Sequence, residues 1–166
     1  MNCKKLTNYE LLLQNAHDEN VSVYENFDLN GDETCSSRLC GLYLNGNVAL
    51  DKDLDTAVEK SCILAEELGH HYTTYGNILS QDSVSNQKQE LRARMWAYNK
   101  LIGLMGIIKS YEHGCQTYHE MAEYLDVTEE FLRDALEKYR QKYGVCTTVD
   151  NYIIYFEPGL GVVKMN

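Results

Sequence analysis

The stretch from Thr56 to Tyr75 constrains the fold most, because it has the sequence of one long amphipathic helix. Thr56 is followed three positions later by Glu59, which is the capping-box spacing of a helix start. At about 100° per residue, its apolar and small residues fall on one broad arc. They are Ala57, Val58, Cys62, Ala65, Leu68, Gly69, Tyr72 and Tyr75. We expect this arc to face a hydrophobic core.

Just past the edge of that arc, the helix carries the sequence Glu66-Glu67-Leu68-Gly69-His70. In the His-Glu-x-x-His motif of zinc enzymes, two ligands four positions apart share a helical face, and the intervening glutamate acts as general base. Glu66 replaces the first histidine here, and a carboxylate can also bind zinc. The ligand spacing survives while the ligand type changes. The simpler alternative is a surface Glu/His pair, which stabilises a helix by a few tenths of a kcal/mol.

A second helix is expected from Asn86 to about Ile108. Its predicted apolar face consists of Leu91, Met95, Tyr98, Leu101, Ile102 and Met105. Glu90 projects into this face, one turn before Arg94, and a buried carboxylate needs a partner because an unpaired buried charge is costly. Two partners remain open: Arg94 in a structural ion pair, or a metal ion held jointly with Glu66 and His70.

Residues 57–73 and 89–98 resemble the ImmA/IrrE family of metallo-endopeptidases, which phages and mobile elements of Gram-positive bacteria carry. The resemblance covers roughly residues 40 to 143, and its most specific parts are Glu-Leu-Gly-His and Glu-x-x-Ala-x-x-Trp-Ala. It implies His70 as a metal ligand, Glu67 as the general base and Glu90 as the third ligand. Glu66 stands where the family's commoner form has its first histidine.

The exchange at Glu66 has a chemical consequence for the metal. One imidazole and two carboxylates form a harder ligand set than a two-histidine site, which weakens zinc binding and favours oxygen-preferring ions. We therefore expect a divalent metal, zinc first, with manganese or iron as alternatives. His71 is a further candidate ligand because it follows Glu67 at the same spacing, and is otherwise expected to be structural or to contact substrate.

The residues before this long helix have the pattern of a short helix followed by short strands. The helix is expected from Thr7 to His17, and the strands are expected at Val21–Tyr24, Leu39–Leu44 and Val48–Leu50. The Asn45-Gly46 step between the last two strands predicts a hairpin, and the polar stretch from Asp28 to Ser37 predicts a loop. With the two long helices, these elements predict an α+β domain with a small antiparallel sheet over residues 1–110, and the resemblance implies that this domain is zincin-like.

Residues 111–166 are expected to form a second module. Thr117–Tyr143 has the pattern of a helix, a tight turn and a second helix, which is a helix-turn-helix shape, and a terminal β-hairpin is expected from Tyr152 to Val163. DNA recognition and protein docking are the two interpretations of this shape. From Lys109 to Tyr143, eight acidic residues outnumber five basic ones, which favours packing or protein docking.

The composition bears on partners and location. The chain has 25 Asp plus Glu against 15 Lys plus Arg, a net charge of −10, which opposes phosphate contacts, so no direct DNA binding is expected. No apolar run is long enough for a signal peptide or a membrane span, so we expect a cytoplasmic protein without a membrane contact. The six cysteines are then expected to be reduced.

Two functions follow as hypotheses. The first is a metal-dependent endopeptidase that acts on a repressor-type regulatory protein of a phage or mobile element, as the family resemblance implies. The second is a catalytically degenerate, peptidase-like module that binds and sequesters a repressor or another host or phage protein. They differ in whether Glu66, Glu67, His70 and Glu90 still form a working metal site.

Overall fold

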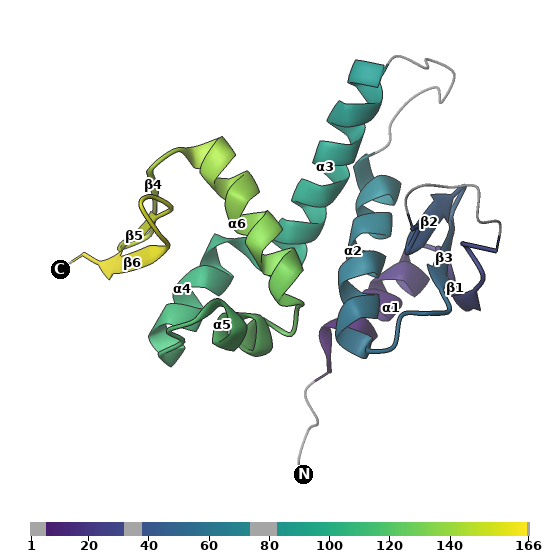
Figure 1. Cartoon of the computed structure of the whole chain (residues 1–166), viewed down its shortest axis with the longest axis horizontal. Helices are drawn as coiled ribbons and strands as arrows, with labels where there is room; N and C mark the ends of the chain where they lie inside the picture. Colours follow the sequence, from purple (N-terminus) through teal and green to yellow (C-terminus); the bar gives the residue numbers. More distant parts are fainter. Residues whose placement is uncertain (1–5, 32–37, 74–82, 166) are drawn as a thin grey trace, which may run out of the picture. The chain divides into compact units, whose positions relative to one another are not determined.

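The computed structural model describes residues 6–31, 38–73 and 83–165, and these form an α+β protein (Figure 1). The helices are α1 (Asn8–Asp18), α2 (Ala57–Thr73), α3 (Ser83–Leu101), α4 (Gly103–His113), α5 (Tyr118–Leu125) and α6 (Glu129–Tyr143). The strands are β1 (Ser22–Phe27), β2 (Gly41–Leu44), β3 (Asn47–Asp51), β4 (Cys146–Val149), β5 (Tyr152–Tyr155) and β6 (Gly161–Lys164). The chain separates into two compact units, Met1–Ala97 (unit 1) and Tyr98–Asn166 (unit 2). The division therefore falls inside α3 rather than at 110/111.

Unit 1 contains a three-stranded sheet in the order β1-β3-β2. The hairpin predicted at Asn45-Gly46 is confirmed: β2 and β3 are antiparallel, Leu44 lies opposite Asn47, and both turn residues have positive φ. The expectation of an antiparallel sheet is wrong for β1, which pairs parallel with β3. The chain passes through β2 between these two strands, so β1 and β3 can run in the same direction.

Helices α1 and α2 pack together and contact the strands of this sheet (Figure 1). Both helices begin with a capping box, at Thr7 with Glu10 and at Thr56 with Glu59. The predicted apolar arc of α2 is confirmed in its central part. The core of unit 1 contains Leu12, Ala16, Val48, Leu50, Leu64, Ala65 and Leu68. The predicted last residue of this helix, Tyr75, lies outside the described residues.

The single helix predicted over 86–108 is wrong, because the structure has two helices, α3 and α4, in that region. The break comes at Ile102, and Gly103, the first residue of α4, has a φ of +60°, in the left-handed region, which does not continue the preceding helix. The buried side of α3 agrees with the prediction at Tyr98 and differs from it elsewhere. It consists of Ala93, Ala97 and Tyr98, whereas Leu91 is 45% exposed.

Unit 2 contains the predicted pair of helices, α5 and α6, which begin at the caps Thr117 and Thr128. Its strands form an antiparallel sheet in the order β4-β5-β6, so the predicted hairpin is the second half of a three-stranded sheet. The short sequence Cys-Thr-Thr-Val of β4 has little apolar character and did not predict a strand. Side chains of the helices and of the sheet meet in one core: Ile107, Leu132, Ala135, Tyr139 and Ile154.

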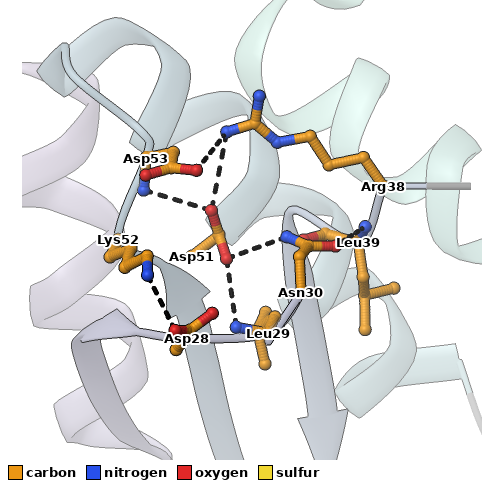
Figure 2. Close-up of polar contacts among 8 residues, drawn as sticks. All are labelled: Asp28, Leu29, Asn30, Arg38, Leu39, Asp51, Lys52 and Asp53. Atoms are coloured by element: carbon orange, nitrogen blue, oxygen red, sulfur yellow. Dashed lines mark hydrogen bonds and ion pairs between the residues drawn. The ribbon is translucent and has the colours of Figure 1, made fainter. Parts of the chain in front are cut away.

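A buried carboxylate fixes the end of β3 (Figure 2). Asp51 is 1% exposed and accepts hydrogen bonds from the backbone N–H groups of Leu29 and Asp53, each at 3.1 Å, and from the side-chain amide of Asn30 at 3.0 Å. Arg38 lies 3.6 Å from it. Burial by itself raises the pKa of a carboxyl, but these donors and the Arg38 charge outweigh it, so the pKa of Asp51 is lowered.

Two further findings concern the expectations on location and cysteines. Among the described residues, no helix is both long and apolar enough to cross a membrane. Four cysteines lie in the described part of the chain and form no disulfide bonds there: Cys40, Cys62, Cys115 and Cys146. Cys3 and Cys35 lie outside the described residues.

Candidate functional site

The candidate site lies where α2 and α3 approach each other in unit 1. Gly69 is the point of approach: a Cβ atom at this position would lie 2.3 Å from the carbonyl oxygen of Ala93. About one helical turn further along each helix, Tyr72 of α2 stacks on Trp96 of α3, with ring centroids 4.7 Å apart. These contacts hold the part of α2 that carries Glu66, Glu67 and His70 against the part of α3 that carries Glu90.

The close approach brings His70 of α2 next to Glu90 of α3. Nε2 of His70 lies 3.3 Å from one carboxylate oxygen of Glu90, and Nε of Arg94 donates to the other oxygen at 2.7 Å. Both partners that the sequence left open for Glu90 are therefore adjacent to it: Arg94 directly, and His70 as a potential fellow ligand. The expectation that Glu90 is buried is wrong, because its side chain is 45% exposed.

A metal ion fixes the distances between the side-chain atoms that bind it. Two ligand atoms bound at 2.0–2.2 Å in a tetrahedral site are about 3.3–3.6 Å apart. The 3.3 Å between His70 and Glu90 matches that separation. Glu66 is partly buried one turn before His70. In the described part of the chain, however, no three His, Cys, Asp or Glu side chains are already grouped around one ion position, so the fit extends to two ligands.

Glu67 occupies a different environment from its neighbour Glu66. Its side chain packs against β2, where a Cβ added to Gly41 would lie 2.8 Å from its carboxylate, and the backbone N–H of Tyr43 donates to it. Burial is the main cause that raises the pKa of Glu67 to about 7, and the charges of Glu66 and Glu90 add to it, while the Tyr43 N–H opposes it. A carboxyl with this pKa can accept and release a proton near neutral pH.

His71 is tied to the sheet rather than to the His70–Glu90 pair. The backbone N–H of Gly46 donates to the Tyr43 hydroxyl oxygen at 3.1 Å, and Nδ1 of His71 lies 2.9 Å from the same oxygen. The hydroxyl proton can therefore be donated to Nδ1, which leaves the proton of a neutral His71 ring on Nε2. This arrangement supports a structural role for His71, the second of the roles expected from the sequence.

Sequence reasoning missed Tyr43 and Trp96. Tyr43 lies within an apolar run and was expected only as part of a strand, although its backbone contacts Glu67 and its hydroxyl contacts His71. Its position two residues before the Asn45-Gly46 turn was the available signal. Trp96 was noted only as part of the resemblance, and its stacking on Tyr72 shows what it contributes to the α2–α3 contact.

No protein-family model matches the chain, and comparisons with curated proteins and with solved structures return no match. In the candidate site, His70 and Glu90 are in contact. The side chain of Glu67 is packed against β2. Glu66 lies close enough to Glu67 for its charge to raise the pKa of the Glu67 carboxyl.

Proposed function

We propose that unit 1 is a metal-dependent endopeptidase domain of the ImmA/IrrE kind, with its centre on α2 and α3. The observation that carries the proposal is the contact of His70 with Glu90 across two helices, at a separation that suits two ligands of one ion. Glu66, four positions before His70, is the third ligand of this proposal. The zincin-like description of the domain is part of the same proposal and follows from the sequence resemblance.

The chain's own residues have separate tasks in this proposal. His70, Glu90 and Glu66 hold the ion, which is zinc or an oxygen-preferring metal such as manganese or iron. A bound ion of this type polarises a peptide carbonyl and acidifies water. Glu67 is the proton acceptor: its pKa is about 7 in the metal-free protein, and a bound cation would lower it, so the carboxylate is available to take a proton near neutral pH. Gly41 of β2 leaves room for the Glu67 carboxylate, and the backbone N–H of Tyr43 donates to it.

The substrate in this proposal is a repressor-type regulatory protein of a phage or mobile element. The support for it is the sequence resemblance, together with an acidic unit 2 that suits protein contacts better than phosphate contacts. The protein would meet its substrate in the cytoplasm, without DNA or a membrane as a partner.

A specific observation favours a second candidate function. Arg94 donates to Glu90 at 2.7 Å and supplies the positive charge that a metal ion would otherwise supply. A site neutralised in this way needs no ion to be stable. The second candidate is therefore a catalytically degenerate module that uses the same surface to bind and sequester a repressor or another host or phage protein.

Metal content and cleavage distinguish the two candidates. The purified protein is equilibrated with zinc, manganese or iron, dialysed, and analysed for bound metal by mass spectrometry. It is then incubated with the repressor encoded beside its gene, and the products are identified by mass spectrometry. The peptidase predicts one ion per chain and a defined cleavage. An empty site in metal-replete buffer, with an intact repressor held in a complex, would instead establish the sequestering module.

Glu67→Gln is the decisive variant, and Glu123→Gln on the exposed face of α5 is its matched control. Loss of the proton acceptor should slow hydrolysis by about 10²- to 10⁴-fold without loss of bound metal, because the exchange keeps the size of the side chain. The control should cleave like the wild type. Undiminished cleavage by Glu67→Gln would remove Glu67 from the mechanism.

A further inference from the structure

Unit 2 contains a cavity of about 520 Å³ that no part of the proposed function uses. It lies between the end of α4, the first turns of α5 and α6, and the turn before β6. Its lining includes Ile107, Tyr111, Cys115, Tyr118, Met121 and Arg133. Binding cavities for small molecules usually measure about 300–1,000 Å³ and combine an apolar lining with a few polar groups. We propose that this cavity binds a small amphipathic carboxylate, with its apolar body inside and its carboxylate on Arg133.

The apolar part of the ligand has a preformed place. Ile107, Met121 and Val162 are buried and line the cavity from three different elements, α4, α5 and β6. Tyr111 and Tyr118 add aromatic surface at the more exposed side. An alkyl chain or an aromatic ring of a ligand would thus exchange water for hydrophobic contacts, which is the main source of affinity in such cavities.

Arg133 is the group that selects a carboxylate. Its guanidinium lies 4.4 Å from the centroid of the Tyr118 ring, so stacking fixes its plane at the cavity wall. Nε and Nη2 of Arg133 donate to a single oxygen of Glu129, at 2.9 and 2.6 Å. These bonds use two of the five N–H groups of a guanidinium, so further N–H groups remain for a second carboxylate.

The start of α5 does not compete for this role. The carboxylate of Glu120 accepts the backbone N–H groups of Gln116 and Thr117 at 2.7 and 3.1 Å, and the Thr117 hydroxyl accepts the N–H of Glu120. These bonds occupy three N–H groups at the helix start, and the Glu120 carboxylate places a negative charge there that opposes a second anion. Selection of the charged group therefore falls to Arg133.

Cys115 and Cys146 allow a direct test. Cys115 lines the cavity, whereas Cys146 lies exposed on β4 and does not. Octanoate is the probe, and 1-octanol, which has the same chain length but no charge, is its control. The rates at which N-ethylmaleimide labels the two thiols of the full-length protein are measured by mass spectrometry. We expect saturating octanoate to slow labelling of Cys115 on the order of tenfold, because a ligand that occupies the cavity would lie against this thiol and block the reagent. Labelling of Cys146 should not change.

The charge preference is tested by substitution. Octanoate should protect Cys115 at concentrations about two- to fivefold lower than 1-octanol, the factor for one partly exposed ion pair. In Arg133→Gln, the two probes should protect Cys115 at equal concentrations, and Arg133→Lys should restore part of the preference for octanoate. Lys138→Gln, on the same helix, should behave like the wild type. Failure of both probes to protect Cys115, equal protection of Cys146, or a preference that survives Arg133→Gln would each overturn the proposal.

Discussion

Gly69 of α2 and Ala93 of α3 are in contact through backbone atoms, since a Cβ at position 69 would lie 2.3 Å from the Ala93 carbonyl oxygen and 2.8 Å from its carbonyl carbon. A side chain at the contact could rotate away, but backbone atoms cannot. Any residue larger than glycine at position 69 must therefore push the two helices apart. The same displacement would separate His70 from Glu90.

Gly69→Ala should lower the free energy of unfolding by about 1–3 kcal/mol, the usual cost of forcing atoms into a packed contact. Alanine favours helices over glycine by about 1 kcal/mol, so the steric cost must exceed that gain. Urea unfolding measures the difference. Gly106→Ala in α4 is the control, because its added Cβ would meet only the movable end of Leu125 at 3.1 Å. Equal effects of the two variants would show that the α2–α3 contact is not tight.

Glu67→Gln should become more stabilising as the pH rises. In the metal-free protein the pKa of Glu67 is about 7, against about 4.5 for an ordinary glutamate, so the native state keeps a proton that the unfolded chain loses between these values. Native stability therefore falls over this range, and the full cost is present above pH 7. The advantage of Glu67→Gln should grow to at most about 3 kcal/mol at pH 8. Urea unfolding with a chelator, from pH 4.5 to 8, measures it, and a pH-independent difference would contradict the raised pKa.

Asp51→Asn should cost about 1–3 kcal/mol at pH 7, because the new amide would direct N–H groups at the N–H donors that now bond the carboxylate. The pKa of Asp51 is lowered, so its charge stabilises the native state above the ordinary value of 3.8, and this stabilisation is lost as the pH falls through the native pKa. Thermal unfolding at several pH values should show the difference from wild type shrinking in acid. Asp53→Asn, at an exposed position beside Arg38, should have the smaller effect.

Glu66→His should tighten zinc binding, since imidazole suits zinc better than a second carboxylate does. Competition with a coloured chelator measures the affinity. Glu66→Ala should weaken binding relative to the wild type. If neither substitution changed the affinity, residue 66 would not contact a metal, and the peptidase proposal would lose its third ligand.

Duplex DNA should not bind at submicromolar concentration even at low salt, where electrostatic attraction is strongest. The expectation rests on the excess of acidic residues over Lys109–Tyr143. Fluorescence anisotropy with a labelled duplex is a suitable measurement. Tight, salt-sensitive binding would show that a local basic surface outweighs the net charge.

The parts of the fold that depend on neighbouring residues were predictable. The start of α2 follows from Thr56 and Glu59, and the β2–β3 turn follows from Asn45-Gly46, because capping and turn preferences act within a few positions. The parallel pairing of β1 with β3 was not predictable in this way, since it joins segments separated by a loop and another strand.

The candidate site shows the same limit. The spacing of Glu66, Glu67 and His70 and the presence of Glu90 could be read from the sequence. On the buried face of α3, Tyr98 could be read in the same way, but Ala93 and Ala97 could not, because small residues are buried there by a close helix contact. The contact of Tyr43 with Glu67 arises only when β2 folds onto α2.

Helix α3 contributes to the interiors of both units. Ala93 contacts Gly69 in unit 1, whereas Tyr98 packs on Phe131, and Asn99 accepts a hydrogen bond from Tyr139 at 3.1 Å, in unit 2. The boundary between the units therefore lies within a helix, and neither unit can be separated from the other at a flexible linker. A fragment that began only after α3 would lose Tyr98 and Asn99 and so expose Phe131 and Tyr139, whereas a fragment that ended before Ala93 would leave Gly69 without its helix contact.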